Sequence, residues 1–329
     1  MHEAGGRMSC FVNNPADIRL GVIGMTPGNG HPYSWSAIIN GFDGELMNRD
    51  CLEDGFRIYL NKVDSKMLGL PGVRVTHIAC EGIERASHIA AISHIPQVCS
   101  SPLELLGQVD AVLLATDLAD EQQRRAEPFV AAGMPIFIDK PLCGSMQALR
   151  YFSRQVQRGA PLLSSSSMRY AKELQPYHGG EIPELGRLQL ISMSMPKQWM
   201  SYGIHALEAI YPITGCGYTS VQSLPLQDGM LVHLQHRRGI DVVISLLKNG
   251  VYGAPLQLLG TGGNLSLSYP DSFSAFKAQL TDFVQYLRTG QRPYDFQETI
   301  ELIRLLLAAE HSSRMHHKKI NLETAEWQI

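Results

Sequence analysis

A lysine placed directly after an apolar segment is the first residue of this sequence whose position suits acid–base chemistry. Lys140 lies in the segment 138–142 (IDKPL), and the apolar run Pro135–Ile138 leads into it. At the carboxyl end of a buried strand, a lysine faces the ligand crevice, where burial and neighbouring charges can tune it for proton transfer. The competing interpretation is a solvated loop lysine.

A histidine in the second half of the chain is the other candidate acid or base. His205 lies in the segment 201–208 (SYGIHALE). If a helix begins near Ser201, then Ser201, His205 and Glu208 share one helical face. A histidine there can exchange a proton near neutral pH. The alternative is a packed histidine beside a serine that caps the helix.

A glycine-rich loop follows the first apolar segment, and Pro32 then marks the first turn of a helix. Glycines let backbone N–H groups approach a pyrophosphate, and the helix N-terminus adds partial positive charge. Three residues separate Gly24 from Gly28, so the loop is longer than the G-x-G-x-x-G fingerprint. An ordinary strand–helix turn is the alternative. The residues expected to contact the phosphates are Gly24, Gly28, Asn29, Gly30 and His31.

The ribose of a dinucleotide is expected to meet an acidic residue at the end of the second strand. Asp43 and Glu45 have the usual spacing but follow no strand, whereas Glu81 ends the segment 74–81 (RVTHIACE). We therefore choose Glu81 and infer an insertion at Phe42–Gly72. Arg85 lies one helical turn further on and could meet a 2′-phosphate, so NADP remains an alternative to NAD, which Glu81 favours.

The first half of the chain alternates short apolar runs with longer amphipathic ones, which predicts parallel strands joined by crossover helices. Pro128 should kink or split one of these helices. A helix is expected at Met146–Gln157 and a last strand within Pro161–Ser167. The earlier strands are expected at Arg19–Gly24, Arg74–Glu81, Val109–Thr116 and Pro135–Ile138.

The second half has alternating segments separated by glycine-bearing turns, which predicts an open, mostly antiparallel sheet. Helices at Ser272–Thr289 and Phe296–Met315 close this part. The strands are expected at Arg187–Met195, Gly217–Ser223, Met230–Gln235, Ile240–Leu247 and Pro255–Leu259. The predicted architecture is thus a lead-in at 1–17, a doubly wound α/β dinucleotide-binding domain at 18–167, and an α+β substrate and oligomerisation domain at 168–329.

Composition excludes several classes of protein. The chain has 329 residues, 44% hydrophobic and 18% charged, with a net charge of −3. This balance is neither that of a disordered chain nor that of a nucleic-acid-binding protein. The longest apolar runs are far shorter than the ~20 residues of a membrane span. We expect no signal peptide, a cytoplasmic location and reduced thiols for the six scattered cysteines.

No metal site is expected from the sequence. His233 and His236 could bind a metal only if their side chains converged on one side of a strand. His316 and His317 lie among basic residues near the chain end and are expected on the solvated surface.

Taken in order, these motifs resemble the glucose–fructose oxidoreductase/inositol dehydrogenase (Gfo/Idh/MocA) family. The resemblance runs from about Ile18 to Leu322 and includes the carboxyl-terminal pattern beginning FKAQLTDFVQYLRTGQRPYDF. It implies a Rossmann domain that holds NAD(P). It also implies a second domain whose open sheet often forms oligomer contacts, so we expect a homo-oligomer, a dimer or a tetramer.

The resemblance also implies roles for particular residues. Lys140 matches the lysine of the family's E-K-P motif, near the nicotinamide ribose and the reacting carbinol, with Asp139 at the Glu position and Pro141 completing the motif. His205 matches the histidine that exchanges a proton with the substrate hydroxyl. Thr116 matches a residue beside the nicotinamide, and Arg169 matches an arginine on the substrate side.

Two departures from the family pattern affect the predicted site. Ser201 stands where the family has Asp four residues before the histidine, and a serine cannot stabilise an imidazolium by a full charge. The usual histidine after the fourth strand is absent as well. Tyr202 could replace the missing Asp as an oxygen partner. Trp199, Lys197 and Arg169 are expected to line the substrate pocket.

The resemblance favours an NAD(P)-dependent oxidoreductase that moves hydride between nicotinamide and a carbinol or ketone carbon. The expected substrate is a small polyol or keto-sugar, in the form of a sugar, a nucleotide-sugar or a cyclitol. Lys140 and His205 would handle the proton. One alternative is a non-catalytic dinucleotide sensor or regulatory protein of the same fold. The other is a cofactor-free lyase or epimerase that uses the same two residues.

Overall fold

The computed structural model describes residues 10–26, 28–50 and 54–329. Its contacts divide the chain into two compact units. The first unit holds the described residues up to Asp139, together with Gln155–Leu163 and Phe276–Asp295; the second holds Lys140–Arg154, Ser164–Ala275 and Phe296–Ile329. Neither unit is therefore one continuous half of the chain, because the segment Phe276–Asp295 returns to the first unit.

A six-stranded parallel sheet forms the centre of the first unit, in the order β3-β2-β1-β4-β5-β6. This is the doubly wound arrangement, with its reversal of strand order between β1 and β4. Five of its strands lie where the sequence predicted them, whereas β3 was not predicted. The strands are β1 (Ile18–Ile23), β2 (Val73–Ala79), β3 (Gln97–Val98), β4 (Ala111–Leu114), β5 (Ile136–Ile138) and β6 (Leu162–Leu163).

The helices of the first unit connect these strands. Two of them, α2 and α3, occupy the inferred insertion between α1 and β2. Pro128 was expected to kink or split a helix, and it does not split α5: one proline removes one backbone hydrogen bond, and Ala132 still bonds the Pro128 carbonyl. The helices are α1 (His31–Asn40), α2 (Gly44–Asp50), α3 (Asp54–Leu60), α4 (Ile83–Ile92) and α5 (Gln122–Ala131).

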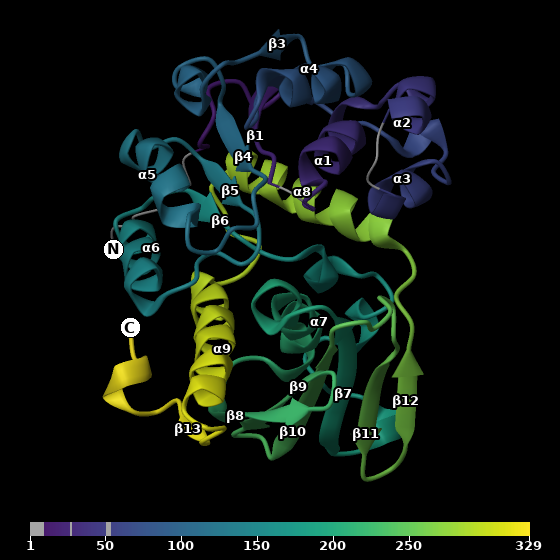
Figure 1. The fold of residues 1–329 in the computed structure, drawn as a ribbon, viewed down its shortest axis with the longest axis vertical. Helices are drawn as coiled ribbons and strands as arrows, with labels where there is room; N and C mark the ends of the chain where they lie inside the picture. Colours follow the sequence, from purple (N-terminus) through teal and green to yellow (C-terminus); the bar gives the residue numbers. More distant parts are fainter. Residues whose placement is uncertain (1–9, 27, 51–53) are drawn as a thin grey trace, which may run out of the picture. The chain divides into compact units, whose positions relative to one another are not determined.

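Aromatic rings fill the core of the first unit around β5. The ring of Phe137 lies 5.4 Å from that of Trp35 in α1 and 5.6 Å from that of Phe283. Phe283 belongs to α8 (Ser272–Thr289), which is drawn in yellow-green in Figure 1. This packing gives a physical reason why most of α8 belongs to the first unit although its sequence lies near the carboxyl end.

A seven-stranded sheet forms the second unit, in the order β12-β11-β7-β10-β9-β8-β13. Within the described part of this second sheet, only β7 and β10 pair in parallel, which confirms that the sheet is mostly antiparallel. The short strands β12 and β13 were not predicted. The strands are β7 (Leu188–Pro196), β8 (Tyr218–Leu226), β9 (Gly229–His236), β10 (Ile240–Leu247), β11 (Leu256–Gly260), β12 (Asn264–Leu267) and β13 (Ile320–Asn321).

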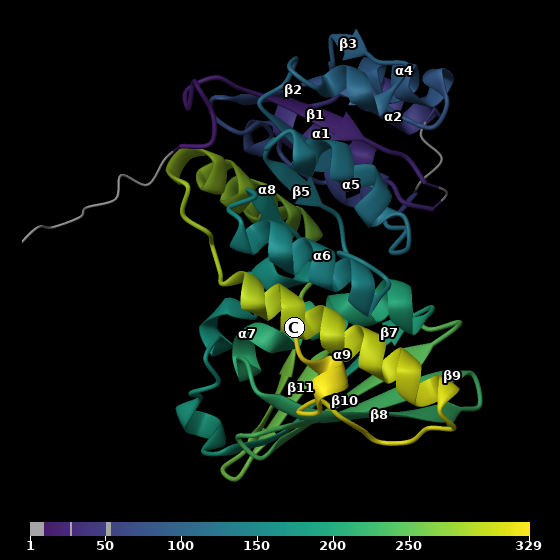
Figure 2. The same cartoon turned by 90° about the vertical axis from the view of Figure 1, so that its left-hand side faces the viewer.

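Helices α7 (Ile204–Thr214) and α9 (Phe296–Arg314) cover one face of this sheet (Figure 2). The helical segment near Ser201 begins as a π-helical turn at Trp199–Gly203, and α7 follows it, so the α-helical spacing considered for Ser201 and His205 does not apply. Gly203 permits this turn, since a Cβ there would lie 2.5 Å from the ring of Trp199. Helix α6 (Met146–Gln157) has the predicted bounds. Among the described helices, none combines the length and apolar character needed to cross a membrane.

Candidate functional site

The glycine loop after β1 lies at the carboxyl edge of the parallel sheet. Gly24 packs against the first turn of α1, where a Cβ would lie 2.3 Å from Pro32. Gly28 has a φ of +82°, and a Cβ built on it meets no atom within 4 Å. Gly30 instead faces the ring of Phe56 in α3, at 1.9 Å from a built Cβ. Gly28 is therefore the glycine that presents open space to a ligand.

The first turn of α1 uses its backbone donors within the loop. The His31 N–H donates to Oδ1 of Asn29 at 2.9 Å, and the Tyr33 and Ser34 N–H groups both donate to the Gly30 carbonyl at 3.1 Å. The sequence predicted that this helix N-terminus would face the phosphates. The amides of His31, Tyr33 and Ser34 bond the chain itself, and the phosphate contact of this helix end stays a prediction.

A buried carboxylate joins this loop to the end of β5. Asp139 is 1% exposed. Its Oδ2 accepts a hydrogen bond from Nδ2 of Asn29 at 3.0 Å and lies 2.6 Å from Nδ1 of His31. The His31 ring stacks on Trp35 with 4.9 Å between ring centroids. Asn29 and His31, predicted to contact the cofactor, thus lie beside Asp139, the residue before Lys140.

The end of β4 is tied to the end of β5 by a glutamine. Thr116 is fully buried, and its hydroxyl donates to Oε1 of Gln122 at 2.9 Å. The Nε2 of Gln122 donates to the carbonyls of Thr116 and Asp139. Asp117, next along the chain, accepts from the hydroxyl of Thr26 at 2.8 Å. Sequence reasoning missed Gln122, because nothing local shows that it bridges two strand ends.

The predicted ribose acceptor follows the carboxyl end of β2. The Glu81 N–H donates to the Gly24 carbonyl at 3.0 Å, so this residue is fixed beside the glycine loop. Its side chain is 57% exposed and forms an ion pair with Arg125 of α5. Glu121 binds the same arginine at 2.6 Å. Arg85, the alternative partner for a 2′-phosphate, is exposed on α4.

Lys140 begins the second unit and is buried, at 6% exposure. The interpretation as a solvated loop lysine does not fit this burial. Leu142 after it is buried as well, and Pro141 between them is joined to Lys140 by a cis peptide bond. Burial of an ammonium group is costly unless the surroundings compensate for it, and such positions are typical of functional lysines.

His205 lies in the first turn of α7, where a serine from another element meets it. Its Nδ1 is 2.6 Å from Oγ of Ser166. Ser166 belongs to the serine run 164–167 that follows β6 and precedes the short helix η3 (Ser167–Tyr170). Ser201, expected to share a face with His205, donates instead to the Gln198 carbonyl at 3.3 Å.

A buried ion-pair network holds η3 against α7. Nε of Arg169 lies 2.6 Å from Oε2 of Glu208, and its Nη1 lies 2.6 Å from Oε2 of Glu298. Burial raises the pKa of Glu208, while Arg169 and the Ser166 N–H act in the opposite direction. Two donors of Arg169 are thus committed to carboxylates of its own unit, and we expect its first role to be structural.

Three further predicted pocket residues have polar partners. Nζ of Lys197 donates to the hydroxyl of Tyr202 at 2.8 Å and lies 4.5 Å from its ring centroid. The Tyr202 ring meets the His205 ring edge-on at 5.3 Å. Trp199 is buried, and its Nε1 donates to the Leu306 carbonyl at 2.8 Å. The structure thus brings Lys197, Tyr202 and His205 together in one cluster.

The two histidines of β9 do not converge. His233 is half-buried with Nε2 2.7 Å from Oδ1 of Asp241, whereas His236 is buried with Nε2 2.9 Å from the Cys216 carbonyl. Three residues apart on a strand, they lie on opposite faces of the sheet. Within the described part of the chain, no three potential ligands among His, Cys, Asp and Glu gather closely enough for a metal ion.

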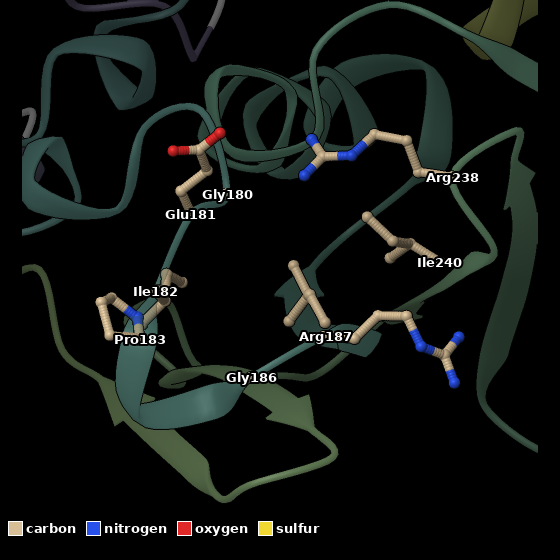
Figure 3. A pocket seen from close by; sticks show the side chains of 9 residues that line it. Gly180, Glu181, Ile182, Pro183, Gly186, Arg187, Arg238 and Ile240 are labelled. Atoms are coloured by element: carbon tan, nitrogen blue, oxygen red, sulfur yellow. The ribbon is translucent and has the colours of Figure 1, made fainter.

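A hollow of about 350 Å³ in the second unit lies outside all the predicted site residues. Figure 3 shows the carboxylate of Glu181 and the guanidinium of Arg238 at its rim, with Ile182 and Ile240 nearby, while the guanidinium of Arg187 points away. Arg238 already donates to the carbonyls of residues 179 and 214. The hollow lacks the charged, buried side chains that would define a ligand site.

Comparison with solved structures finds the same fold in dehydrogenases. Myo-inositol dehydrogenase from Corynebacterium glutamicum is 16% identical, with 94% of this chain and 100% of that chain covered and a TM-score of 0.69. Myo-inositol 2-dehydrogenase from Lactobacillus plantarum is 12% identical, with 93% and 99% covered and a TM-score of 0.73. GenD2 from gentamicin A biosynthesis, in complex with NAD, is 14% identical, with 98% and 100% covered and a TM-score of 0.73.

No protein-family model and no curated protein sequence matches the chain. At these low identities the likeness establishes the architecture, a Rossmann-type parallel sheet with a second domain built on a mixed sheet. The residues that act in this chain have to be argued from its own geometry, because a shared fold does not carry a function with it.

Proposed function

We propose that this protein is an NAD(P)-dependent oxidoreductase acting on CH–OH groups, with a sugar, a nucleotide-sugar or a cyclitol as its substrate. One observation carries the proposal: the glycine loop follows β1, Glu81 follows β2, and Thr116 and Asp139 follow β4 and β5. All four lie at the carboxyl edge of one parallel sheet, where ligands of such sheets bind. The solved dehydrogenases of the same fold support it.

The residues at this edge fit a dinucleotide. Gly28 combines a positive φ with open space where a side chain would stand, which lets the backbone approach a pyrophosphate. The exposed carboxylate of Glu81 can accept hydrogen bonds from the ribose hydroxyls, which favours NAD. Because the first-turn amides of α1 are already bonded, Gly28 and its neighbours would bear the phosphate contact.

The reacting groups of the chain would be Lys140 and His205. The bound nicotinamide would supply the hydride acceptor or donor. The buried ammonium of Lys140 would polarise the carbonyl oxygen or help to remove the hydroxyl proton, because burial strengthens its interaction with an oxygen that develops charge. His205 would exchange the proton with the substrate hydroxyl.

The first experiment is equilibrium binding of NADH and NADPH, followed by nicotinamide fluorescence. Gly28 and Gly41 provide a matched pair, because their φ values are +82° and +84° and neither built Cβ meets an atom within 4 Å. Gly28→Ala and Gly41→Ala should therefore lose similar stability, about 1–2 kcal/mol each. Only Gly28→Ala should weaken dinucleotide binding, by roughly tenfold or more.

The outcome also separates the alternative functions. Binding together with turnover on a panel of polyols, keto-sugars and cyclitols would support the dehydrogenase. Binding without turnover on the whole panel would favour a dinucleotide sensor, and Ser201 in place of the acid of the family pattern is the observation in its favour. Absence of binding for both dinucleotides would overturn the proposal and favour a cofactor-free lyase or epimerase.

We also propose that the chain forms a homo-oligomer through the second sheet. The face opposite α7 and α9 carries half-buried or exposed apolar side chains, among them Leu231, Val243 and Leu247. Such a face is typical of a surface that a second copy covers. Sedimentation of the wild-type protein should show a dimer or a tetramer. Val243→Lys should shift the oligomer towards the monomer. A monomeric wild-type protein would contradict this part of the proposal.

A further inference from the structure

A serine from a distant part of the chain contacts the ring of His205. Oγ of Ser166 lies 2.6 Å from Nδ1 of the ring, although 39 residues separate the two in sequence. Ser166 is 1% exposed. This short hydrogen bond between a buried serine and a half-buried histidine fixes the orientation of the ring.

Two hydrogen bonds and a neighbouring ion pair hold Ser166 itself in place. Its Oγ accepts the Met168 N–H at 3.2 Å, which caps η3. Its own N–H donates to Oε1 of the buried Glu208 at 3.0 Å. Glu208 is paired with Arg169 of η3. The serine therefore stands on a fixed frame that includes the same helix as His205, so the distance between the two residues is a constrained one.

The residue that sequence spacing placed beside His205 does something else. Ser201 lies within the π-helical turn, whose wider winding changes the four-residue relation expected of an α-helix. Its hydroxyl donates to the Gln198 carbonyl. Residue 201 therefore supplies no side chain that orients the histidine. Ser166 lies at hydrogen-bond distance from Nδ1 of the ring instead.

We propose that Ser166 is the positioning residue of His205: its hydroxyl oxygen accepts the Nδ1–H and so holds the neutral ring in the tautomer that presents an unprotonated Nε2. A hydroxyl oxygen has two acceptor sites, and the Met168 N–H uses one of them, so the second is available to Nδ1–H. In the opposite direction the hydroxyl would donate to Nδ1 and the ring proton would lie on Nε2, and the measurement of the tautomer distinguishes the two directions. The inference rests on the proposed function, in which Nε2 exchanges the proton with the substrate.

A serine orients the ring without adding charge. A carboxylate in the same place would also hold Nδ1–H, but it would favour the imidazolium by its full charge. The charged groups on α7 and on the elements that contact it include Glu208 of α7, Arg169 of η3, Glu298, Glu301 and Arg304 of α9, and Lys197 before the π-helical turn. Arg169 neutralises part of this acidic set, and Glu301 is engaged by Tyr211 at 2.6 Å.

The tautomer can be measured directly on the whole protein, without any substrate. Histidine labelled with ¹⁵N gives separate signals for Nδ1 and Nε2 in ¹⁵N–¹H correlation spectra, and His205→Asn assigns the signals of residue 205. The wild-type protein at a pH where the ring is neutral should show Nδ1 protonated. Ser166→Ala should return the ring to the Nε2–H form that free imidazole favours, and Ser166→Thr, which keeps the hydroxyl, should restore the wild-type pattern.

Ser201→Ala is the matched control, since it removes a hydroxyl near the same histidine that bonds a backbone carbonyl instead. It should leave the tautomer unchanged. An Nε2–H tautomer in the wild-type protein, or the same tautomer in wild type and Ser166→Ala, would overturn the inference. If Ser166→Ala unfolds, the wild-type and Ser166→Thr spectra still decide, because both must show Nδ1–H.

Turnover, where it is found, gives a second readout. Ser166→Ala should lower kcat by up to roughly 10²-fold, the scale of a general acid–base contribution, with little change in KM. The two proposals fail separately: loss of NAD(H) binding would overturn the oxidoreductase function but not the tautomer result, and a wrong tautomer would overturn the role of Ser166 but not cofactor binding.

Discussion

Nδ1 of His31 lies 2.6 Å from Oδ2 of Asp139, so the first turn of α1 is tied to the end of β5. Asn29 donates to the same oxygen at 3.0 Å. The buried carboxylate of Asp139, the residue before Lys140, therefore fixes the glycine loop to the end of β5.

Asp139→Ala should destabilise the first unit, because it removes the acceptor of the half-buried His31 and leaves the buried Asn29 amide with only the longer contact to the Ala115 carbonyl, at 3.5 Å. The expected loss of unfolding free energy is about 1–3 kcal/mol, the usual cost of an unsatisfied buried polar group. Urea denaturation measures it. Asp120→Ala is the control, because Asp120 is exposed on a loop at the same sheet edge. Equal midpoints for the two variants would contradict the buried role of Asp139.

Glu81→Ala should weaken NADH binding more than NADPH binding, because the carboxylate would accept from the ribose hydroxyls and repel a 2′-phosphate. Glu121→Ala removes the other carboxylate partner of Arg125 and leaves Glu81 in place. The ratio of the two dissociation constants should shift only in Glu81→Ala. A similar shift in both variants would assign the effect to Arg125 instead.

Lys140→Ala should lower turnover by roughly 10²- to 10⁴-fold while the dinucleotide affinity stays near its wild-type value. The reason is that the buried ammonium would act on the reacting oxygen and not on the dinucleotide. Lys172→Ala serves as control, since Lys172 is exposed and paired with Asp271. Retained activity in Lys140→Ala would remove this lysine from the mechanism.

The free energy of unfolding should decrease as the pH falls through the range in which His236 takes up a proton. Its Nε2 bonds the Cys216 carbonyl at 2.9 Å, and its Nδ1 accepts the Arg238 N–H at 3.2 Å, an arrangement that requires the neutral ring. Burial lowers the pKa of His236 below its ordinary value, while the Cys216 carbonyl acts in the opposite direction.

The sign of this effect follows from proton binding. As the pH falls through about 6.5, the unfolded chain binds the proton before the folded one, so the free energy of unfolding decreases until the pH falls below the folded-state pKa. His236→Gln should reduce the decrease between pH 7.5 and pH 5 in urea denaturation. His94→Asn, at an exposed position with a φ of +54°, should leave it unchanged. An unaltered decrease in His236→Gln would place its origin elsewhere.

Periodicity predicted the long elements well and the short ones poorly. Helices α6 and α8 and strand β10 have the bounds that their patterns predicted, because amphipathic spacing over many residues is a local property. The two-residue strands β3 and β13 exist only through pairing with β2 and β8. No local pattern marks them, since their hydrogen bonds go to distant segments of the chain.

For the candidate site as well, the sequence predicted one part and the tertiary structure decided the other. The order of glycine loop, Glu81, Lys140 and His205 along the chain determined the class of fold and the residues to inspect, because strand ends and crossover helices follow from local pattern. Tertiary structure alone decided their partners. Ser166 reaches His205 across 39 residues and Asp139 reaches His31 across 108. Such pairings depend on how buried segments pack against each other, and no spacing within the sequence encodes them.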